Sequence, residues 1–217
     1  MNIFVLDLDP EKAAQAHCDC HVVKMITEAA QMLCTVSSGL GMTVPYKPTH
    51  QSHPCTVWAG ESLENWLWLQ ALGKALHDEY KHRWPGREHK SGLVVEGLVP
   101  PPLPSKGLTR FALAMPEEYH SVDPVKAYRR YYREGKAHLL KYTNREAPWW
   151  TKRVPQEFLD RFRVVQVHGN TTGVGAHKPL SVFRVDEIVT TQGHYIDWPQ
   201  RFGSEEAAWQ AVWSCHR

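Results

Sequence analysis

One stretch of the chain decides the fold: residues 10–36, with the sequence PEKAAQAHCDCHVVKMITEAAQMLCTV. Apolar side chains recur in it with the period of an α-helix, at Ala14, Cys18, Val22, Met25, Ala29 and Met32. Pro10 suits the first turn of a helix, and the serines and glycines after residue 36 are typical of its end. We therefore expect one long helix here, with one face buried.

Four ionisable side chains share one face of this expected helix: His17, His21, Lys24 and Glu28. At about 100° per residue they fall within about 60° of one another, beside the apolar stripe. Asp19 lies close in sequence but on another side of the helix. Burial and neighbouring charge at the edge of a core shift pKa values towards neutrality, which favours acid/base chemistry.

Length and composition indicate a soluble globular protein with a full core. The chain has 217 residues, a formal net charge of +2 and five cysteines. An odd number of cysteines without paired spacing favours free thiols and a reducing compartment. No apolar run reaches the roughly 18 residues of a spanning helix, and the first residues carry acids rather than the bases of a signal peptide. We expect a cytoplasmic protein with no membrane partner.

The pattern along the chain predicts a mainly α protein, with a helical core over residues 1–154 and a small C-terminal α+β (ββα-like) appendage over residues 155–217. Residues 2–8 suit a short strand or an extended lead-in. Helical periodicity recurs over residues 10–36, 55–84, 88–97 and 124–142. The appendage is expected to hold strands at 163–167, 180–189 and 194–198 and a helix at 204–213. The glycine-rich residues 169–175 lack the ending of a phosphate loop and are expected to form a turn.

Positive charge is concentrated in residues 123–163, which hold eleven Lys or Arg against five Asp or Glu. Aromatic residues are interleaved with these bases, at Tyr128, Tyr131, Tyr132, Tyr142, Trp149 and Trp150. The mixture predicts a nucleic-acid partner, DNA or RNA, because cations hold phosphates while rings stack on bases. The expected contacts are Arg129, Arg130, Arg133, Lys136, Tyr132, Arg145 and Trp149. The alternative is a solvated helix whose aromatic side chains face the core.

A second group of polar side chains lies in the loop Lys47-Pro-Thr-His50-Gln-Ser-His53-Pro-Cys55. Prolines restrict this loop, and rigid polar loops often form the wall of a site, here with His50 and His53 facing nucleic acid. A zinc or iron site at His17, His21, His50 and His53, with Cys55, has suitable residue types. Because neither Cys-x2-Cys nor His-Glu-x-x-His accompanies them, we expect no cofactor and no metal, with the histidines satisfied by backbone carbonyls.

Several runs resemble small phage and bacterial proteins described as pyrimidine-dimer DNA glycosylase or endonuclease V-like. The runs are 4–9 FVLDLD, Ala13-Ala14, Cys18-Asp19, 24–33 KMITEAAQML, Ser52-His53-Pro54 and Trp58. They span roughly residues 1–84, and 131–136 YYREGK adds a looser similarity. The resemblance implies a helical DNA-binding core with a catalytic glutamate on its first long helix, at Glu28. It also implies cleavage of the glycosidic bond through an imine, followed by strand scission.

The nucleophile is where the sequence departs from that family. Endonuclease V-like enzymes use the amino group of a small residue exposed by removal of the initiator methionine, whereas Asn2 is bulky and predicts that Met1 is kept. Lys24 is the internal amine, expected to be partly buried beside His17 and His21 with a lowered pKa. A Lys24–Glu28 pair can also simply support the helix.

The resulting hypothesis is a DNA base-excision enzyme, a glycosylase with lyase activity. Lys24 is the amine, Glu28 stabilises positive charge on the sugar or moves protons, and His17 and His21 are acid/base or phosphate partners. Trp149 or Tyr132 is expected to fill the gap left by an extruded base. Two alternatives stay open: a non-catalytic nucleic-acid-binding phage protein, and a metal-dependent nucleic-acid hydrolase or base-modifying enzyme that uses the four histidines.

Overall fold

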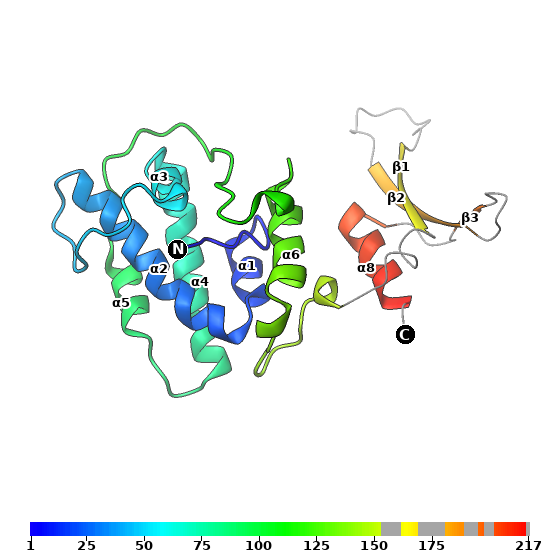
Figure 1. Ribbon diagram of the computed structural model, residues 1–217, viewed down its shortest axis with the longest axis horizontal. Helices are drawn as coiled ribbons and strands as arrows, with labels where there is room; N and C mark the ends of the chain where they lie inside the picture. The colour runs from blue at the N-terminus through cyan, green and yellow to red at the C-terminus, as the bar shows by residue number, and fades with distance from the viewer. Residues whose placement is uncertain (153–161, 169–180, 189–194, 198–201, 216–217) are drawn as a thin grey trace, which may run out of the picture. The chain divides into compact units, whose positions relative to one another are not determined.

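The computed structural model describes residues 1–152, 162–168, 181–188, 195–197 and 202–215. The chain divides into two compact units, Met1–Ala147 and Pro148–Arg217 (Figure 1). The first unit is helical, and the second holds a small antiparallel sheet and a helix. The predicted class, mainly α with a small C-terminal α+β appendage, is confirmed. The boundary along the chain lies between Ala147 and Pro148, whereas the sequence predicted it between residues 154 and 155.

The expected helix over residues 10–36 is two helices, α1 (Pro10–Ala16) and α2 (Asp19–Gly39). His17 and Cys18 between them are extended, with ψ angles of 139° and 162°. Distant groups accept the backbone N–H groups at this break: the Tyr132 hydroxyl accepts that of Cys18 at 2.9 Å, and the Lys141 carbonyl accepts that of Asp19 at 2.8 Å. The expectation of one continuous helix is therefore wrong, because tertiary partners replace the helical hydrogen bonds.

The core of the helical unit is built around α4 (Leu63–Arg83), which packs against α1, α2, α3 (Pro54–Ala59) and α5 (Lys90–Gly97) (Figure 1). Ser62 caps α4 by accepting the N–H of Asn65 at 3.1 Å. The single helix expected over residues 55–84 is therefore two helices, α3 and α4. Gly73 lies where α4 meets α5, and a Cβ there would be 2.9 Å from a methyl group of Val95. A larger residue would push these helices apart.

The first residues of the chain form the extended lead-in, and no strand is present among residues 2–8. Ile3, Phe4, Val5 and Leu6 are all buried. The side-chain oxygen of Asn2 accepts the N–H groups of Ile3 and Phe4, and Phe4 has a φ of 33°. A positive φ is unfavourable for an aromatic residue, so the surrounding contacts hold this conformation.

The predicted helix over residues 124–142 is shorter than expected: α6 (Pro124–Gly135) is followed by a 3₁₀ turn, η2 (Ala137–Leu139). Asp123 caps α6 by accepting the N–H groups of Val125 and Lys126. Two further 3₁₀ turns are η1 (Glu117–Tyr119) and η3 (Trp149–Thr151). From α6, Arg129 donates to the backbone carbonyl of Leu6 at 2.8 Å and so ties the N-terminal segment to this helix.

The C-terminal unit contains β1 (Phe162–His168), β2 (Ser181–Ile188), β3 (Tyr195–Asp197) and α8 (Glu205–Cys215), as predicted. The strands are antiparallel in the order β1-β2-β3, with Val164 opposite Val185. A small apolar core joins the sheet to the helix, formed by Phe162, Val185, Phe202, Ala208 and Val212. The glycine-rich residues 169–175 lie outside the described residues. Among the helices described, none is both long and apolar enough to cross a membrane.

Candidate functional site

Glu28 lies in the middle of α2 with its side chain only 10% exposed. Its Oε2 accepts the backbone N–H of Asn2 at 2.7 Å and lies 3.9 Å from the amino group of Met1. Its Oε1 lies 3.5 Å from Nζ of Lys24. The lead-in and one turn of α2 therefore place two amines around one largely buried carboxylate. We call Met1, Lys24 and Glu28 the amine–carboxylate site.

Lys24 does not have the surroundings expected from the sequence. Its side chain is 68% exposed, so it is not partly buried beside His17 and His21. The break before α2 removes His17 from the shared helix face, and His21 is turned into the core. Lys24 Nζ therefore pairs with Glu28 while the rest of its side chain is open to solvent.

The two loop histidines differ in their relation to this site. His53 caps α3, where its Nδ1 accepts the N–H of Cys55 at 3.2 Å. Burial lowers the pKa of His53, and the positive charge of the Met1 amino group lowers it further, while Glu28 opposes the shift. His53 therefore borders the amine–carboxylate site. His50 is exposed, with a φ of 51°, and its Nδ1 lies 2.7 Å from the Thr49 hydroxyl.

His17 and His21 lie in an aromatic cluster rather than in an open cleft. The ring of Phe4 stacks on His21, with centroids 4.5 Å apart, and Tyr132 packs against both imidazoles. His17 Nδ1 contacts the Ala13 carbonyl at 2.6 Å, and His21 Nδ1 contacts the Tyr132 hydroxyl at 2.7 Å. The expected four-histidine set is thus divided between two places, the aromatic cluster and the loop before α3.

Burial lowers the pKa of both cluster histidines, to about 3 for His17 and about 4 for His21. The charges of Lys136 and Lys24 also lower the pKa of His21. Both imidazoles are neutral at pH 7, so they lack the positive charge expected of phosphate partners. His17 is fully buried, and its Nε2 has no hydrogen-bond partner within the described part of the chain.

The predicted nucleic-acid contacts on α6 have different accessibilities. Tyr132 is fully buried, and the expectation that it contacts nucleic acid or fills a gap in the duplex is wrong. Burial raises its pKa well above the usual value, and its hydroxyl serves α2 instead. Arg129 binds Asp7 and is only 15% exposed. Arg130 is 51% exposed and bonds Glu134.

The remaining expected contacts lie on and beyond α6. Arg133 also bonds Glu134. Lys136 Nζ lies 5.1 Å from the ring centre of Tyr131. Trp149 belongs to the C-terminal unit, where its ring packs edge-on against Trp213. The basic segment 123–163 is therefore shared between the two units.

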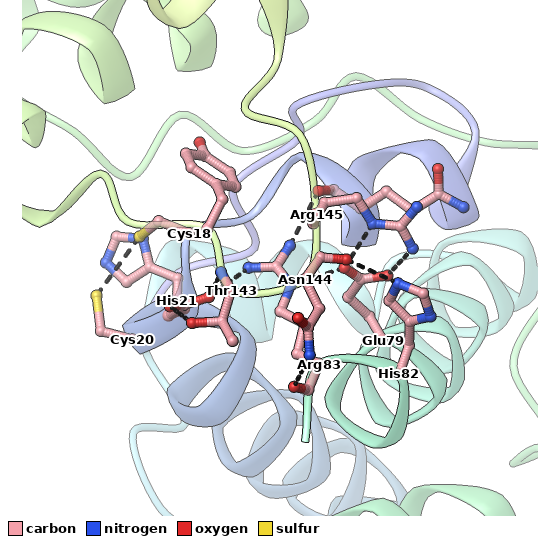
Figure 2. A network of polar contacts seen from close by, with 12 residues as sticks. Cys18, Cys20, His21, Glu79, His82, Arg83, Thr143, Asn144 and Arg145 are labelled. Carbon is pink, nitrogen blue, oxygen red and sulfur yellow. Dashed lines mark hydrogen bonds and ion pairs between the residues drawn. The ribbon is translucent and has the colours of Figure 1, made fainter. Parts of the chain in front are cut away.

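Arg145 belongs to a network of buried charges that the sequence analysis did not predict (Figure 2). Arg145 donates to both oxygens of Glu79, at 2.9 and 2.6 Å. Arg83 donates to Glu79 at 2.7 Å and to Asp19 at 3.0 Å. Asp19 also accepts the N–H and hydroxyl of Thr143. These bonds tie residues 143–145 to α2 and α4.

The charges in this network balance, with two guanidinium groups facing two carboxylates. Burial disfavours the ionised form of Asp19, but bonds from Thr143 and Arg83 outweigh it and lower the pKa. Burial likewise opposes ionisation of Glu79, and bonds from Arg145 and Arg83 again lower the pKa. The only available signal in the sequence was Glu79 and Arg83 at i, i+4 on one helix. Arg145 thus serves the fold.

A surface groove of about 740 Å³ lies beside this network, and its lining includes Gln15, Lys74, Glu79, His82 and Arg145. The residues of the amine–carboxylate site do not line this groove. Its walls carry charges of both signs, so the groove itself has no chemistry that selects a phosphate backbone.

The structure also brings together residues that the sequence analysis had not joined. Cys18, Cys20 and His21 present potential metal ligands within 4.8 Å of one another. The four cysteines whose side chains are described, Cys18, Cys20, Cys34 and Cys55, are free thiols. The Met1 amino group was likewise not paired with Glu28 from the sequence, because a contact between residue 1 and the middle of a helix depends on the path of the lead-in.

Comparison of the chain with protein-family models, with curated proteins and with solved structures found no match.

Proposed function

We propose that the protein is a DNA base-excision enzyme, a glycosylase with lyase activity of the pyrimidine-dimer glycosylase kind. The observation that carries this proposal is the pair of amines around Glu28, 3.5 and 3.9 Å from its carboxylate oxygens. An amine beside a carboxylate can add to a sugar carbon and exchange protons without a metal.

In this reaction an unprotonated amine attacks C1′ of the target nucleotide. A bond forms between the amine nitrogen and C1′, and the glycosidic bond breaks with its electron pair leaving on the base, which takes up a proton. Loss of the amine proton and opening of the sugar ring give an imine, from which elimination breaks the strand. Glu28 stabilises the positive charge that develops on the sugar and accepts the amine proton.

Two amines compete for the role of nucleophile. The Lys24 side chain is mostly exposed, so an incoming substrate can reach its amine. The Met1 amino group is held by the buried lead-in and has His53 nearby. We assign Lys24 as the nucleophile because of its access, and the Met1 amine is the competing assignment that the experiment separates.

The proposal is tested by incubating the protein with duplex DNA, damaged or abasic, in the presence of borohydride. Reduction of an imine gives a permanent protein–DNA crosslink, which an activated water cannot produce. Peptide mapping of the crosslink by mass spectrometry identifies the amine. Lys24→Ala should abolish the crosslink, and Glu28→Gln should keep DNA binding while losing turnover.

Lys81→Ala is the matched control, because Lys81 also pairs with a carboxylate on its own helix, at 2.8 Å from Asp78. This variant should crosslink as the unaltered protein does. A crosslink that maps to Met1 would transfer the nucleophile to the chain's amino group and keep the reaction. The absence of a crosslink with every duplex would overturn the base-excision proposal.

A further inference from the structure

The first turn of α2 brings three potential metal ligands to one place. Cys18 Sγ and Cys20 Sγ are 3.5 Å apart, and a ring nitrogen of His21 completes a group whose atoms all lie within 4.8 Å of one another (Figure 2). Cys18 and His21 are buried, whereas Cys20 is exposed. The group is therefore anchored in the core and open to solvent on one side.

The Sγ–Sγ distance is close to that of a tetrahedral zinc site. With Zn–S bonds of about 2.3 Å and Zn–N bonds of about 2.0 Å, tetrahedral geometry separates two sulfurs by roughly 3.8 Å and a sulfur from a nitrogen by roughly 3.5 Å. The observed Sγ–Sγ distance differs from this by a few tenths of an ångström. The remaining ligand atoms lie within 4.8 Å of one another, so the side chains move closer together when the cation binds.

Two features of the surroundings support cation binding at this group. Cys18 is the N-cap of α2, where the positive end of the helix dipole stabilises negative charge. The Tyr132 hydroxyl lies 3.3 Å from Cys18 Sγ and 2.7 Å from His21 Nδ1, so it orients two of the three ligands. Such supporting hydrogen bonds are typical of protein metal centres.

We propose that Cys18, Cys20 and His21 bind a thiophilic divalent cation, zinc in the first place. Two thiolates balance the charge of the cation, and three protein ligands leave a fourth position for water. The cation would clamp the break between α1 and α2 and, through Tyr132, hold α6 to the same point. This inference does not depend on the proposed base-excision activity.

The test is a titration of the reduced, metal-stripped protein with Co²⁺, followed by displacement with Zn²⁺. We expect thiolate-to-cobalt charge-transfer absorption and the visible bands of tetrahedral cobalt, at one equivalent per chain, with loss of both when Zn²⁺ is added. Zinc should also raise the melting temperature, because it binds the folded chain preferentially. Elemental analysis of the purified protein should find zinc.

Cys20→Ala is the decisive variant, because Cys20 is exposed and alanine is favourable in a helix, so the fold should be retained. It should weaken cation binding by at least about 100-fold, and Tyr132→Phe by about 10- to 100-fold. Cys34→Ala, which removes a thiol outside the group, should bind as the unaltered protein does. Absence of cobalt–thiolate absorption, or equal binding by Cys20→Ala and the unaltered protein, would overturn the proposal.

Discussion

The polar and charged groups in the two halves of α2 differ in how they are paired. At its first turn, Asp19 is bonded to Arg83 and Thr143, and the Cys18 N–H and His21 are bonded to Tyr132, so distant elements hold every one of these groups. Two turns later, Glu28 faces Lys24, which is mostly in solvent. Fully paired buried charges serve the fold, whereas Lys24 presents an exposed amine beside a buried carboxylate, the arrangement on which our proposed reaction depends.

Removing Arg83 should have the largest effect on stability. Arg83→Met removes the buried guanidinium that joins Glu79 to Asp19 and leaves them only Arg145 and Thr143, so we expect a loss of about 3–5 kcal/mol in the free energy of unfolding. Urea denaturation measures it. Lys81→Met on the same helix is the control, and its exposed pair with Asp78 predicts a loss below about 0.5 kcal/mol. Similar losses for the two variants would remove the distinction between buried and exposed pairs.

Acid should destabilise the junction between α1 and α2 through His17 and His21. The pKa of His21 is about 4 and that of His17 about 3 in the folded protein, against 6.5 as the ordinary value. Between these values the unfolded chain binds more protons, so stability is complete above about pH 6.5 and falls as the pH is lowered. The slope is at most about 1.4 kcal/mol per pH unit for each histidine.

Urea midpoints measured across this pH range, with a chelator present so that no cation occupies His21, test the linkage. His21→Gln should reduce the slope between about pH 6.5 and 4, because only His17 then contributes to it. His120→Gln, at an exposed histidine, should leave it unchanged. A stability that does not fall between pH 6.5 and 4 would show that the cluster histidines are not held neutral.

Tyr132→Phe removes one hydroxyl and leaves the Cys18 N–H and His21 Nδ1 without their partner. We expect a loss of about 1–3 kcal/mol, measured by urea denaturation in the presence of a chelator. Tyr131→Phe on the same helix should have a smaller effect, because its ring contacts with Phe4 and Tyr119 remain. Equal losses would mean that the hydroxyl does not support the break before α2.

Lys24→Ala should have the smallest effect on stability, a change below about 0.5 kcal/mol, because the Lys24 side chain is mostly exposed and an i, i+4 pair contributes little. Glu28 keeps the N–H of Asn2 as a partner in this variant. Thermal denaturation checks the change. A loss above about 1 kcal/mol would place Lys24 with the structural charges of α2 rather than with the reactive ones.

Local patterns in the sequence predicted most of the fold. The apolar period predicted the buried face of residues 19–36, Pro10 in the first turn predicted the start of α1, and helical periodicity from residue 124 predicted the start of α6. Alternation predicted the three strands of the C-terminal unit. Each of these features depends on residues close together in the chain, so it can be predicted from the sequence alone. The sequence also identified Glu28 as the candidate carboxylate.

The sequence by itself determined the helical class, the small α+β unit and the presence of ionisable side chains on the first long helix. Only the tertiary structure decided where that helix breaks, that Tyr132 is buried, that Lys24 is exposed, and that the Met1 amine meets Glu28. The physical reason is that each of these outcomes depends on partners distant in the chain. Helical periodicity records which side of a segment is apolar, but not which distant hydroxyl or carbonyl replaces a helical hydrogen bond.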